Sequence, residues 1–295
     1  MARKEPHYFG SDLAELWHAP GPARRPTPEE YFSLFAASAD ATRRGEASVW
    51  YLWSHCAAAE IRDYNPQARI IVTLRNPVDV LPSLHSQYLF GGIEDLEDFE
   101  QALAAEDDRR AGRRIPPGNG TRPWRLFYRD VVRFDEQLAR YLDTFGRERV
   151  HVVLLEDLVA DRMQTFRGVL SFLGVDAEFV PSFEVANANK RIRSAQVRSL
   201  TWKITDPSSP LRRLGKRLIP IHGLRSRMLR SAVPALRRWN TSVAPRPPVS
   251  PELRRELAAE FAPNIRRLGE LIGRDLTHWY AGPDRSLAGA AGTRS

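Results

Sequence analysis

The chain has 295 residues, of which 42% are hydrophobic and 27% are charged, ordinary proportions for a soluble globular protein. This length allows one α/β domain or two small ones, with a substantial core. The single cysteine, Cys56, excludes an intramolecular disulfide and favours a reducing compartment. No apolar run is long enough to span a bilayer and the first residues do not form a signal peptide, so we expect a cytoplasmic protein.

Positive charge is concentrated in one segment. The formal net charge is +8, yet residues 190–238 contain 14 Lys or Arg and one acid, Asp206, which leaves −5 for the rest of the chain. Within residues 211–239, basic residues alternate with apolar ones, and Pro220 and Pro234 interrupt the stretch, which predicts short basic amphipathic helices. Such helices suit an anionic membrane surface or an anionic acceptor. Nucleic acid is electrostatically possible, but no recognised nucleic-acid-binding motif accompanies the charge.

Local signals predict several elements in the first quarter of the chain. Thr27-Pro28-Glu29-Glu30 is a capping box with proline at the first helical position, which predicts a helix over residues 28–40. Its apolar residues are expected in the core: Tyr31, Phe32, Leu34 and Phe35. Residues 49–52 predict a short strand or extended turn, and residues 54–64 predict a helix.

A strand, a sharp turn and a helix follow. Residues 70–74 (IIVTL) are almost entirely apolar, which is typical of a parallel strand covered on both faces. Asn76 is a good N-cap and Pro77 a good first helical residue. Arg75 should therefore lie at the carboxyl end of a strand beside a helix N-terminus, where α/β sheets bind anionic ligands. Ser83 lies about two helical turns further on and can face the same crevice.

Alternatives remain open at this turn. Arg75 fits an anion site, and it fits equally an arginine paired only with a surface carboxylate. Pro82 lies within the predicted helix, where proline removes a hydrogen bond. We expect either a kink or a helix that starts at Pro82.

The second half predicts a second strand and further helices. Residues 150–155 (VHVVLL) form the second buried strand. Helical spacing of apolar residues and terminal glycine or serine caps predict helices over residues 127–145, 165–173 and 251–272. Glu156 and Asp157 follow the strand, and we favour a structural role for them because adjacent residues on a strand point apart.

Several segments match the sulfotransferase family, whose donor is 3′-phosphoadenosine 5′-phosphosulfate, in the order of that family. The motif RNP-x-D-x-x-x-S at residues 75–83 resembles its 3′-phosphate-binding motif. KEPHYF at residues 4–9 resembles the segment with the catalytic Glu in members related to the heparan sulfate enzymes. Further matches are GEAS-x-x-YL at 45–52, EDL at 156–158 and GRDL-x-x-W at 273–279.

This resemblance implies an α/β fold, a three-layer P-loop-NTPase-like parallel sheet flanked by helices. It implies one domain over residues 1–282, with a basic helical segment at 190–240 and a disordered tail at 283–295. The implied reaction is in-line transfer of a sulfuryl group from the donor to a hydroxyl or amine of a glycan, lipid or small molecule, with no metal required.

The resemblance also implies roles for individual residues. Glu5 would be the base that takes the proton from the acceptor hydroxyl. Arg75 and Ser83 would bind the donor's 3′-phosphate, since a bidentate guanidinium and a hydroxyl suit a dianion. The late basic loop supplies further candidate nucleotide contacts: Lys190, Arg191 and Arg193. Glu46 and Tyr51 are expected to be buried structural residues.

The sequence departs from the family pattern in two places. In the family, a strand and a Lys-containing Gly/Thr/Ser-rich loop that hold the 5′-phosphosulfate precede the segment around Glu5, whereas only three residues precede Lys4 here. Some members carry a catalytic Lys where Ala47 stands. We therefore expect donor binding and turnover to be impaired, either because the start codon is assigned too late or because the copy is degenerate.

Two other classes of function remain. One is a catalytically inactive relative that binds anionic lipid or glycan through the basic segment, which would place it at the inner face of the membrane. The other is a nucleic-acid-binding protein that uses the same charge, and we consider it the less favoured.

Overall fold

The computed structural model describes residues 5–16, 25–38, 40–116, 123–181, 190–192, 239–243 and 248–281, together with Val197, Val233 and Leu236. The chain divides into two compact units, one of residues 1–81, 121–182 and 250–295, the other of residues 82–120 and 183–249. The single domain expected over residues 1–282 stays a prediction. Within the described residues, none of the helices combines the length and the hydropathy that crossing a bilayer requires.

Two parallel strands form the sheet of the first unit. β1 (Ile70–Leu74) pairs with β2 (Val150–Leu154) in a register that joins Ile70 to Val150 and Leu74 to Leu154. Both predicted strands are thus confirmed. β1 is not covered on both faces as predicted. From Ile71 to Leu74, exposed and buried residues alternate, and Ile71 is 39% exposed. Parallel pairing brings the residues that follow the two strands to the same edge of the sheet.

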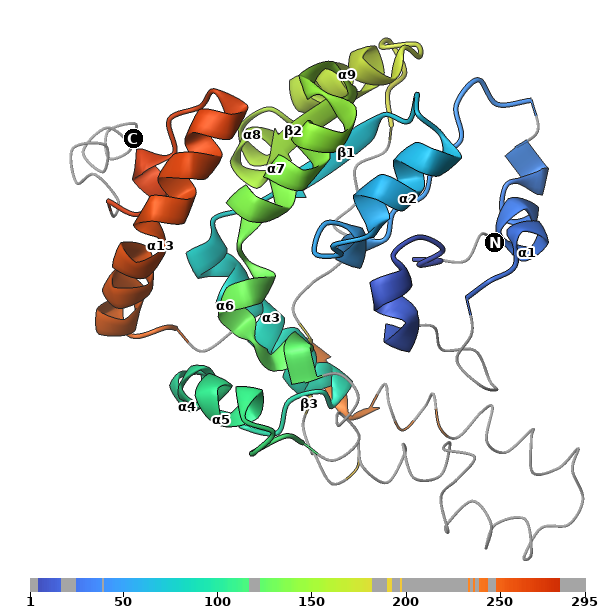
Figure 1. Cartoon of the computed structure of the whole chain (residues 1–295). Helices are drawn as coiled ribbons and strands as arrows, with labels where there is room; N and C mark the ends of the chain where they lie inside the picture. Colours follow the sequence, from blue (N-terminus) through green and yellow to red (C-terminus); the bar gives the residue numbers. More distant parts are fainter. Residues whose placement is uncertain are drawn as a thin grey trace, which may run out of the picture. The chain divides into compact units, whose positions relative to one another are not determined.

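Helices cover this sheet and one another. The α-helices of the first unit are α1 (Pro28–Ser33), α2 (Ala57–Tyr64), the start of α3 (Pro77–Gly91), α6 (Tyr128–Val131), α7 (Phe134–Phe145), α8 (Leu155–Ala160), α9 (Arg162–Leu173) and α13 (Pro251–Ile272). Short 3-10 helices connect them: η1 (Ser11–Leu16), η2 (Ala36–Ser38), η3 (Val49–Tyr51), η4 (Pro123–Leu126), η5 (Arg147–Arg149) and η6 (Thr277–Trp279). Helix α7 contacts both strands and packs between α2 and α13 (Figure 1).

The α7–α13 contact is largely apolar. The buried residues of the two helices recur at helical spacing: Leu138, Tyr141 and Phe145 on α7, and Leu257, Phe261, Ile265 and Leu268 on α13. Polar contacts between them converge on Asp135: the side-chain amide of Asn264 donates to both of its carboxylate oxygens at 3.2 Å, and Nη1 of Arg267 lies 3.8 Å from its Oδ2. The predicted amphipathic helices are therefore confirmed, and the region 127–145 forms two helices, α6 and α7, in place of one.

Most predicted helix ends are confirmed. The capping box of Thr27 is present, and the helices α7, α9 and α13 end at glycines with φ between 68° and 79°. Helix α3 begins at Pro77 with Pro82 in its interior, so it does not start at Pro82. The Oδ1 of Asn76 accepts from the N–H of Val78 at 3.0 Å, as expected of an N-cap.

Two predictions near the N-terminus are wrong. The helix expected over residues 28–40 ends at Ser33, and Phe32 is 49% exposed where a core position was expected. Only Tyr31 of α1 is buried, so little packing favours a longer helix. Residues 49–51 form a 3-10 helix, not a strand, because the N–H of Tyr51 bonds to the carbonyl of Ser48 at 3.1 Å.

The second unit contains the rest of α3, the helices α4 (Phe99–Ala104) and α5 (Glu106–Arg110), and an antiparallel pair of short strands, β3 (Lys190–Ile192) and β4 (Thr241–Val243). An ion pair with both side chains 0% exposed lies within it: Nη2 of Arg109 is 2.7 Å from Oε1 of Glu94. Arg109 also donates to two backbone carbonyls, and Glu94 accepts two backbone N–H groups, so both charges are further compensated by hydrogen bonds.

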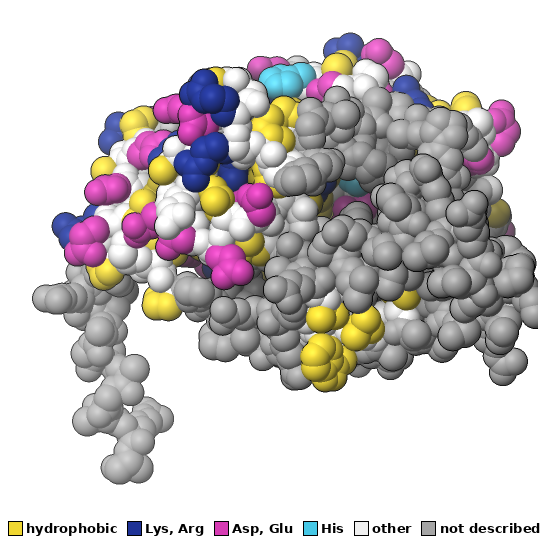
Figure 2. Space-filling view, turned by 90° about the horizontal axis from the view of Figure 1, so that it is seen from below, with side chains coloured by type: hydrophobic (Ala, Val, Ile, Leu, Met, Phe, Trp, Pro, Cys, Tyr) yellow, Lys and Arg dark blue, Asp and Glu magenta, His cyan; other side chains and the backbone are white. Residues whose placement is uncertain are grey.

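One face of the molecule shows mixed charge. In Figure 2, Lys and Arg side chains are interspersed with Asp and Glu side chains over the described part of this face. The basic segment 190–240, on which the prediction of an anionic partner rests, lies mostly outside the described residues.

We expect Arg109→Met to destabilise the protein by about 3–5 kcal/mol, because it leaves the charge of Glu94 buried without its partner. The matched control is Arg113→Ala on the neighbouring turn, which removes an exposed pair with Asp108 and should cost at most about 1 kcal/mol. Urea unfolding measures both. Equal losses of unfolding free energy in the two variants would contradict the prediction.

Candidate functional site

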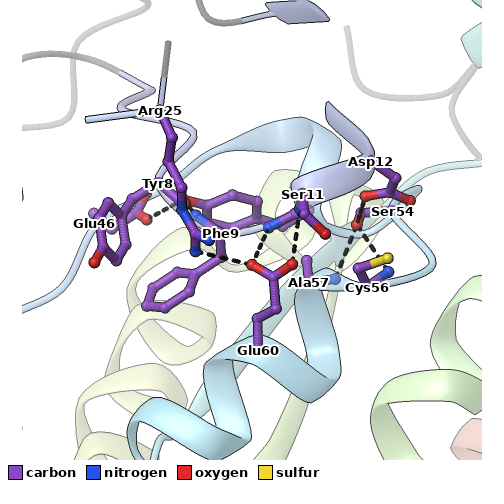
Figure 3. A network of polar contacts seen from close by, with 12 residues as sticks. Tyr8, Phe9, Ser11, Asp12, Arg25, Glu46, Ser54, Cys56, Ala57 and Glu60 are labelled. Atoms are coloured by element: carbon purple, nitrogen blue, oxygen red, sulfur yellow. Dashed lines mark hydrogen bonds and ion pairs between the residues drawn. The ribbon is translucent and has the colours of Figure 1, made fainter. Parts of the chain in front are cut away.

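The segment of residues 5–13 carries the predicted base Glu5 and is held by side chains from later parts of the chain (Figure 3). Glu60 on α2 accepts from the N–H groups of Gly10 at 3.0 Å and Ser11 at 2.8 Å, and from the guanidinium of Arg25 at 2.9 Å. Burial acts to raise the pKa of Glu60, but the hydrogen bonds from this turn and the charge of Arg25 outweigh it and lower that pKa. Glu60 therefore fixes the turn at residues 10 and 11.

A second carboxylate holds the same segment through two hydroxyl groups. Glu46 accepts from the hydroxyl of Tyr51 at 2.6 Å and from that of Ser48 at 3.0 Å. Those hydroxyls accept in turn from the N–H of Phe9 and of His7, each at 3.1 Å. Burial raises the pKa of Glu46, against the lowering effect of the two hydroxyls. These contacts make Glu46 a positioning residue for the backbone beside Glu5.

A third contact joins the end of the segment to the start of α2. Asp12 accepts from the hydroxyl of Ser54 at 2.5 Å and from the N–H of His55 at 2.8 Å. The same Ser54 oxygen accepts from the N–H of Ala57, the first residue of α2, at 2.9 Å. The helix and the segment are therefore held by one shared hydroxyl group.

The backbone of this segment adopts an unusual conformation. Glu5 and His7 have φ values of 53° and 48°, in the left-handed region that residues with a side chain seldom occupy. Such residues cost of order 1–3 kcal/mol each and persist where the surroundings determine them, often at functional sites. Oε2 of Glu5 lies 3.6 Å from Nε2 of His7, and the side chain of Glu5 is 32% exposed. The backbone after Glu5 is thus held in place, and its carboxylate is partly accessible.

The second candidate feature is the turn from β1 to α3. Arg75 directly follows β1, as predicted, and its side chain is 38% exposed. Its Nη2 lies 3.8 Å from Oδ2 of Asp79, too far for a hydrogen bond. Among the described residues, no acceptor takes a hydrogen bond from the Arg75 guanidinium. Asp79 itself accepts from Nη2 of Arg254 on α13 at 2.8 Å.

The C-terminal end of the first unit anchors this turn. The side-chain amide of Asn76 donates to the carbonyl of Trp279 at 2.9 Å. The indole N–H of Trp279 donates to the carboxylate of Glu156, and Arg274 makes two hydrogen bonds of 3.0 Å with Asp157. Arg274 lowers the pKa of Asp157 through these hydrogen bonds and its charge. These contacts support the structural role expected for Glu156 and Asp157.

The remaining predicted residues lie elsewhere. Ser83 is a half-buried residue of α3 in the second unit. Lys190 and Arg191 lie on β3, opposite Val243 and Ser242 of β4, and Arg193 lies outside the described residues. Their roles stay predictions.

Sequence reasoning missed two residues that the structure brings to the site. Glu60 and its backbone partners are 49 and 50 positions apart, and Arg254 and Asp79 are 175 apart. Neither residue belongs to a local motif, and both read as ordinary charges on amphipathic helices.

Known proteins resemble this chain in sequence and structure. The sequence model of the Sulfotransferase family matches residues 15–179, which include β1, Arg75, Ser83 and β2. The crystal structure of a sulfotransferase from Alicyclobacillus acidocaldarius is 30% identical, over 94% of this chain and 86% of that protein, with a TM-score of 0.60. No curated protein matches the chain. The predicted α/β sulfotransferase-like fold is thereby confirmed.

We expect Glu60→Gln to loosen residues 9–13, because a neutral amide loses charge-assisted hydrogen bonds that contribute about 1.5–3 kcal/mol each. The pKa of Glu60 is lowered on folding, so its stabilising effect is complete above the ordinary glutamate pKa of about 4.3 and is lost as the pH falls through the lowered value. At neutral pH, amide hydrogen exchange of this segment should therefore be faster in the variant than in the unaltered protein. As the pH falls through the lowered pKa of Glu60, the segment should lose protection against exchange in the unaltered protein but not in the variant.

Asp63→Asn provides the control, because Asp63 lies on the same helix, is 71% exposed and pairs with Arg62. It should leave exchange of residues 9–13 unchanged. If Glu60→Gln also leaves that exchange unchanged, Glu60 does not hold the segment.

Proposed function

This chain is a member of the sulfotransferase family, and from that premise we propose that it transfers a sulfuryl group from 3′-phosphoadenosine 5′-phosphosulfate to an acceptor hydroxyl or amine. The observation that carries the proposal is the placement of Arg75. Its guanidinium stands at the carboxyl end of β1, before α3, partly exposed and without a hydrogen-bond acceptor among the described residues. A dianionic phosphate suits such a group.

The first N–H groups of α3 are not available to a bound anion. The N–H of Val78 bonds to Oδ1 of Asn76, and those of Asp79 and Val80 bond to its carbonyl. Pro77 has no N–H to offer. An anion at this turn therefore depends mainly on side chains. In the proposal, Arg75 donates to the 3′-phosphate from one side, Ser83 adds its hydroxyl, and Lys190, Arg191 and Arg193 contribute further contacts to the nucleotide.

Glu5 acts as the base in this proposal. The carboxylate takes the proton of the acceptor hydroxyl as its oxygen forms the new bond to sulfur. When bound, the donor supplies the activated sulfuryl group and leaves as adenosine 3′,5′-bisphosphate. The contacts of Glu46 and Glu60 hold the backbone of residues 7–11, next to Glu5. Acceptor binding therefore does not need to order this segment.

The acceptor belongs to the broad class of glycans, lipids and small molecules with a hydroxyl or amine. The excess of basic residues in 190–238 favours an acceptor that is itself anionic or lies at an anionic membrane surface. The single Cys56 favours a cytoplasmic location.

We expect Arg75→Ala to lower the affinity for adenosine 3′,5′-bisphosphate about 100-fold or more, since it removes charge-assisted hydrogen bonds that contribute about 1.5–3 kcal/mol each. Isothermal titration calorimetry measures the change. Arg62→Ala, which removes an exposed arginine of α2, should bind like the unaltered protein. Unchanged affinity in Arg75→Ala would remove the proposed phosphate site.

We expect Glu5→Gln to slow donor turnover about 10²–10⁴-fold while nucleotide affinity stays the same, because a base acts on the rate and not on donor binding. Water serves as the acceptor, and chromatography of released adenosine 3′,5′-bisphosphate gives the rate. Glu178→Gln, which alters a glutamate whose side chain is 82% exposed, is the control. Equal turnover in the Glu5 and Glu178 variants would exclude Glu5 as the base.

A further inference from the structure

Asp79 lies between two guanidinium groups from distant parts of the first unit. Its Oδ1 is 2.8 Å from Nη2 of Arg254, and its Oδ2 is 3.8 Å from Nη2 of Arg75. The cluster contains two positive charges and one negative charge. All three side chains are partly exposed, at 38% for Arg75, 49% for Arg254 and 31% for Asp79, so a ligand from solvent can reach them.

The Arg254–Asp79 contact is one that can be exchanged. Exposed ion pairs contribute at most about 1 kcal/mol. The position of α13 does not depend on it, because the buried apolar face of the helix and the Asn264–Asp135 contact already join α13 to α7. Asp79 is the one hydrogen-bond acceptor of the Arg254 side chain among the described residues. A stronger anion can therefore replace Asp79 at little cost.

A phosphate group is such an anion. It carries a charge of about −1.5 to −2 and three acceptor oxygens, more than a carboxylate offers, and arginine presents a fork of donors that matches it. Since the first N–H groups of α3 are already bonded, a single arginine would leave part of that charge uncompensated. A second arginine next to the first meets this need.

We propose that Arg254 is a second phosphate-binding arginine at the end of β1, held ready by Asp79 until the 3′-phosphate of the nucleotide replaces that carboxylate as its partner. The inference rests on the proposed function, in which Arg75 binds the same phosphate. It adds a residue from α13, which makes the C-terminal helix part of the donor site and gives that site selectivity for nucleotides that carry a 3′-phosphate.

The test compares two probes, adenosine 3′,5′-bisphosphate and adenosine 5′-monophosphate, by calorimetry or competition. Arg254→Ala should weaken binding of the bisphosphate about 10- to 100-fold, the range expected for losing charge-assisted hydrogen bonds, and leave the monophosphate unchanged. Arg255→Ala is the matched control: this neighbour on α13 is 75% exposed and pairs with Glu252, and its removal should change neither affinity.

Asp79→Asn separates phosphate binding from a purely structural contact. It removes the charge that competes with the phosphate, so it should leave the affinity for the bisphosphate equal or raise it a few-fold. A structural link between α3 and α13 would instead make Asp79→Asn and Arg254→Ala weaken both probes alike, which would overturn the inference.

The outcome also distinguishes the inference from the proposed function. If Arg75→Ala abolishes bisphosphate binding while Arg254→Ala keeps the affinity ratio of the two probes, the inference on Arg254 fails and the proposed function stands. If neither Arg75→Ala nor Arg254→Ala changes the affinity for the bisphosphate, the phosphate site is refuted. The proposed function and the inference on Arg254 then both fail.

Discussion

Parallel pairing of β1 with β2 is the constraint on which the site depends. It brings the chain after Leu74 and the chain after Leu154 to one edge of the sheet. Trp279 then joins the two ends, since its carbonyl accepts from Asn76, 203 positions earlier, and its indole N–H donates to Glu156. The turn that presents Arg75 is therefore held from both the neighbouring strand end and the C-terminal end of the unit.

The segment with Glu5 is positioned in a different way. Within the part of the chain that the structure describes, no strand pairs with it, and its backbone N–H groups bond to side-chain acceptors: the carboxylate of Glu60 and two hydroxyl groups oriented by Glu46. These acceptors come from residues 46–60, and together they stabilise a backbone with φ above zero at Glu5 and His7. The arrangement holds the backbone beside Glu5, the proposed base, in a defined conformation.

Burial distinguishes the ion pairs that support the fold from those available to a ligand. Glu94 and Arg109 are fully buried and further hydrogen-bonded, so separating them would leave an uncompensated charge in the interior. The pairs that Asp79 makes with Arg75 and Arg254 are partly exposed, and water compensates each group when they separate. The buried Glu94–Arg109 pair therefore supports the fold. In the inference above, the partly exposed pairs of Asp79 can separate when a phosphate binds the arginines.

The sequence by itself determined the two strands, the Asn76–Pro77 helix start, the glycine helix ends and the place of Arg75, because periodicity and capping act over a few residues. Only the tertiary structure decided where α1 ends, that residues 49–51 form a 3-10 helix, and that Glu60 and Arg254 belong to the site. Glu60 binds backbone about 50 residues away, and Arg254 meets Asp79 across 175 residues. A local pattern carries no information about such partners, because which side chains meet is set by how the helices pack.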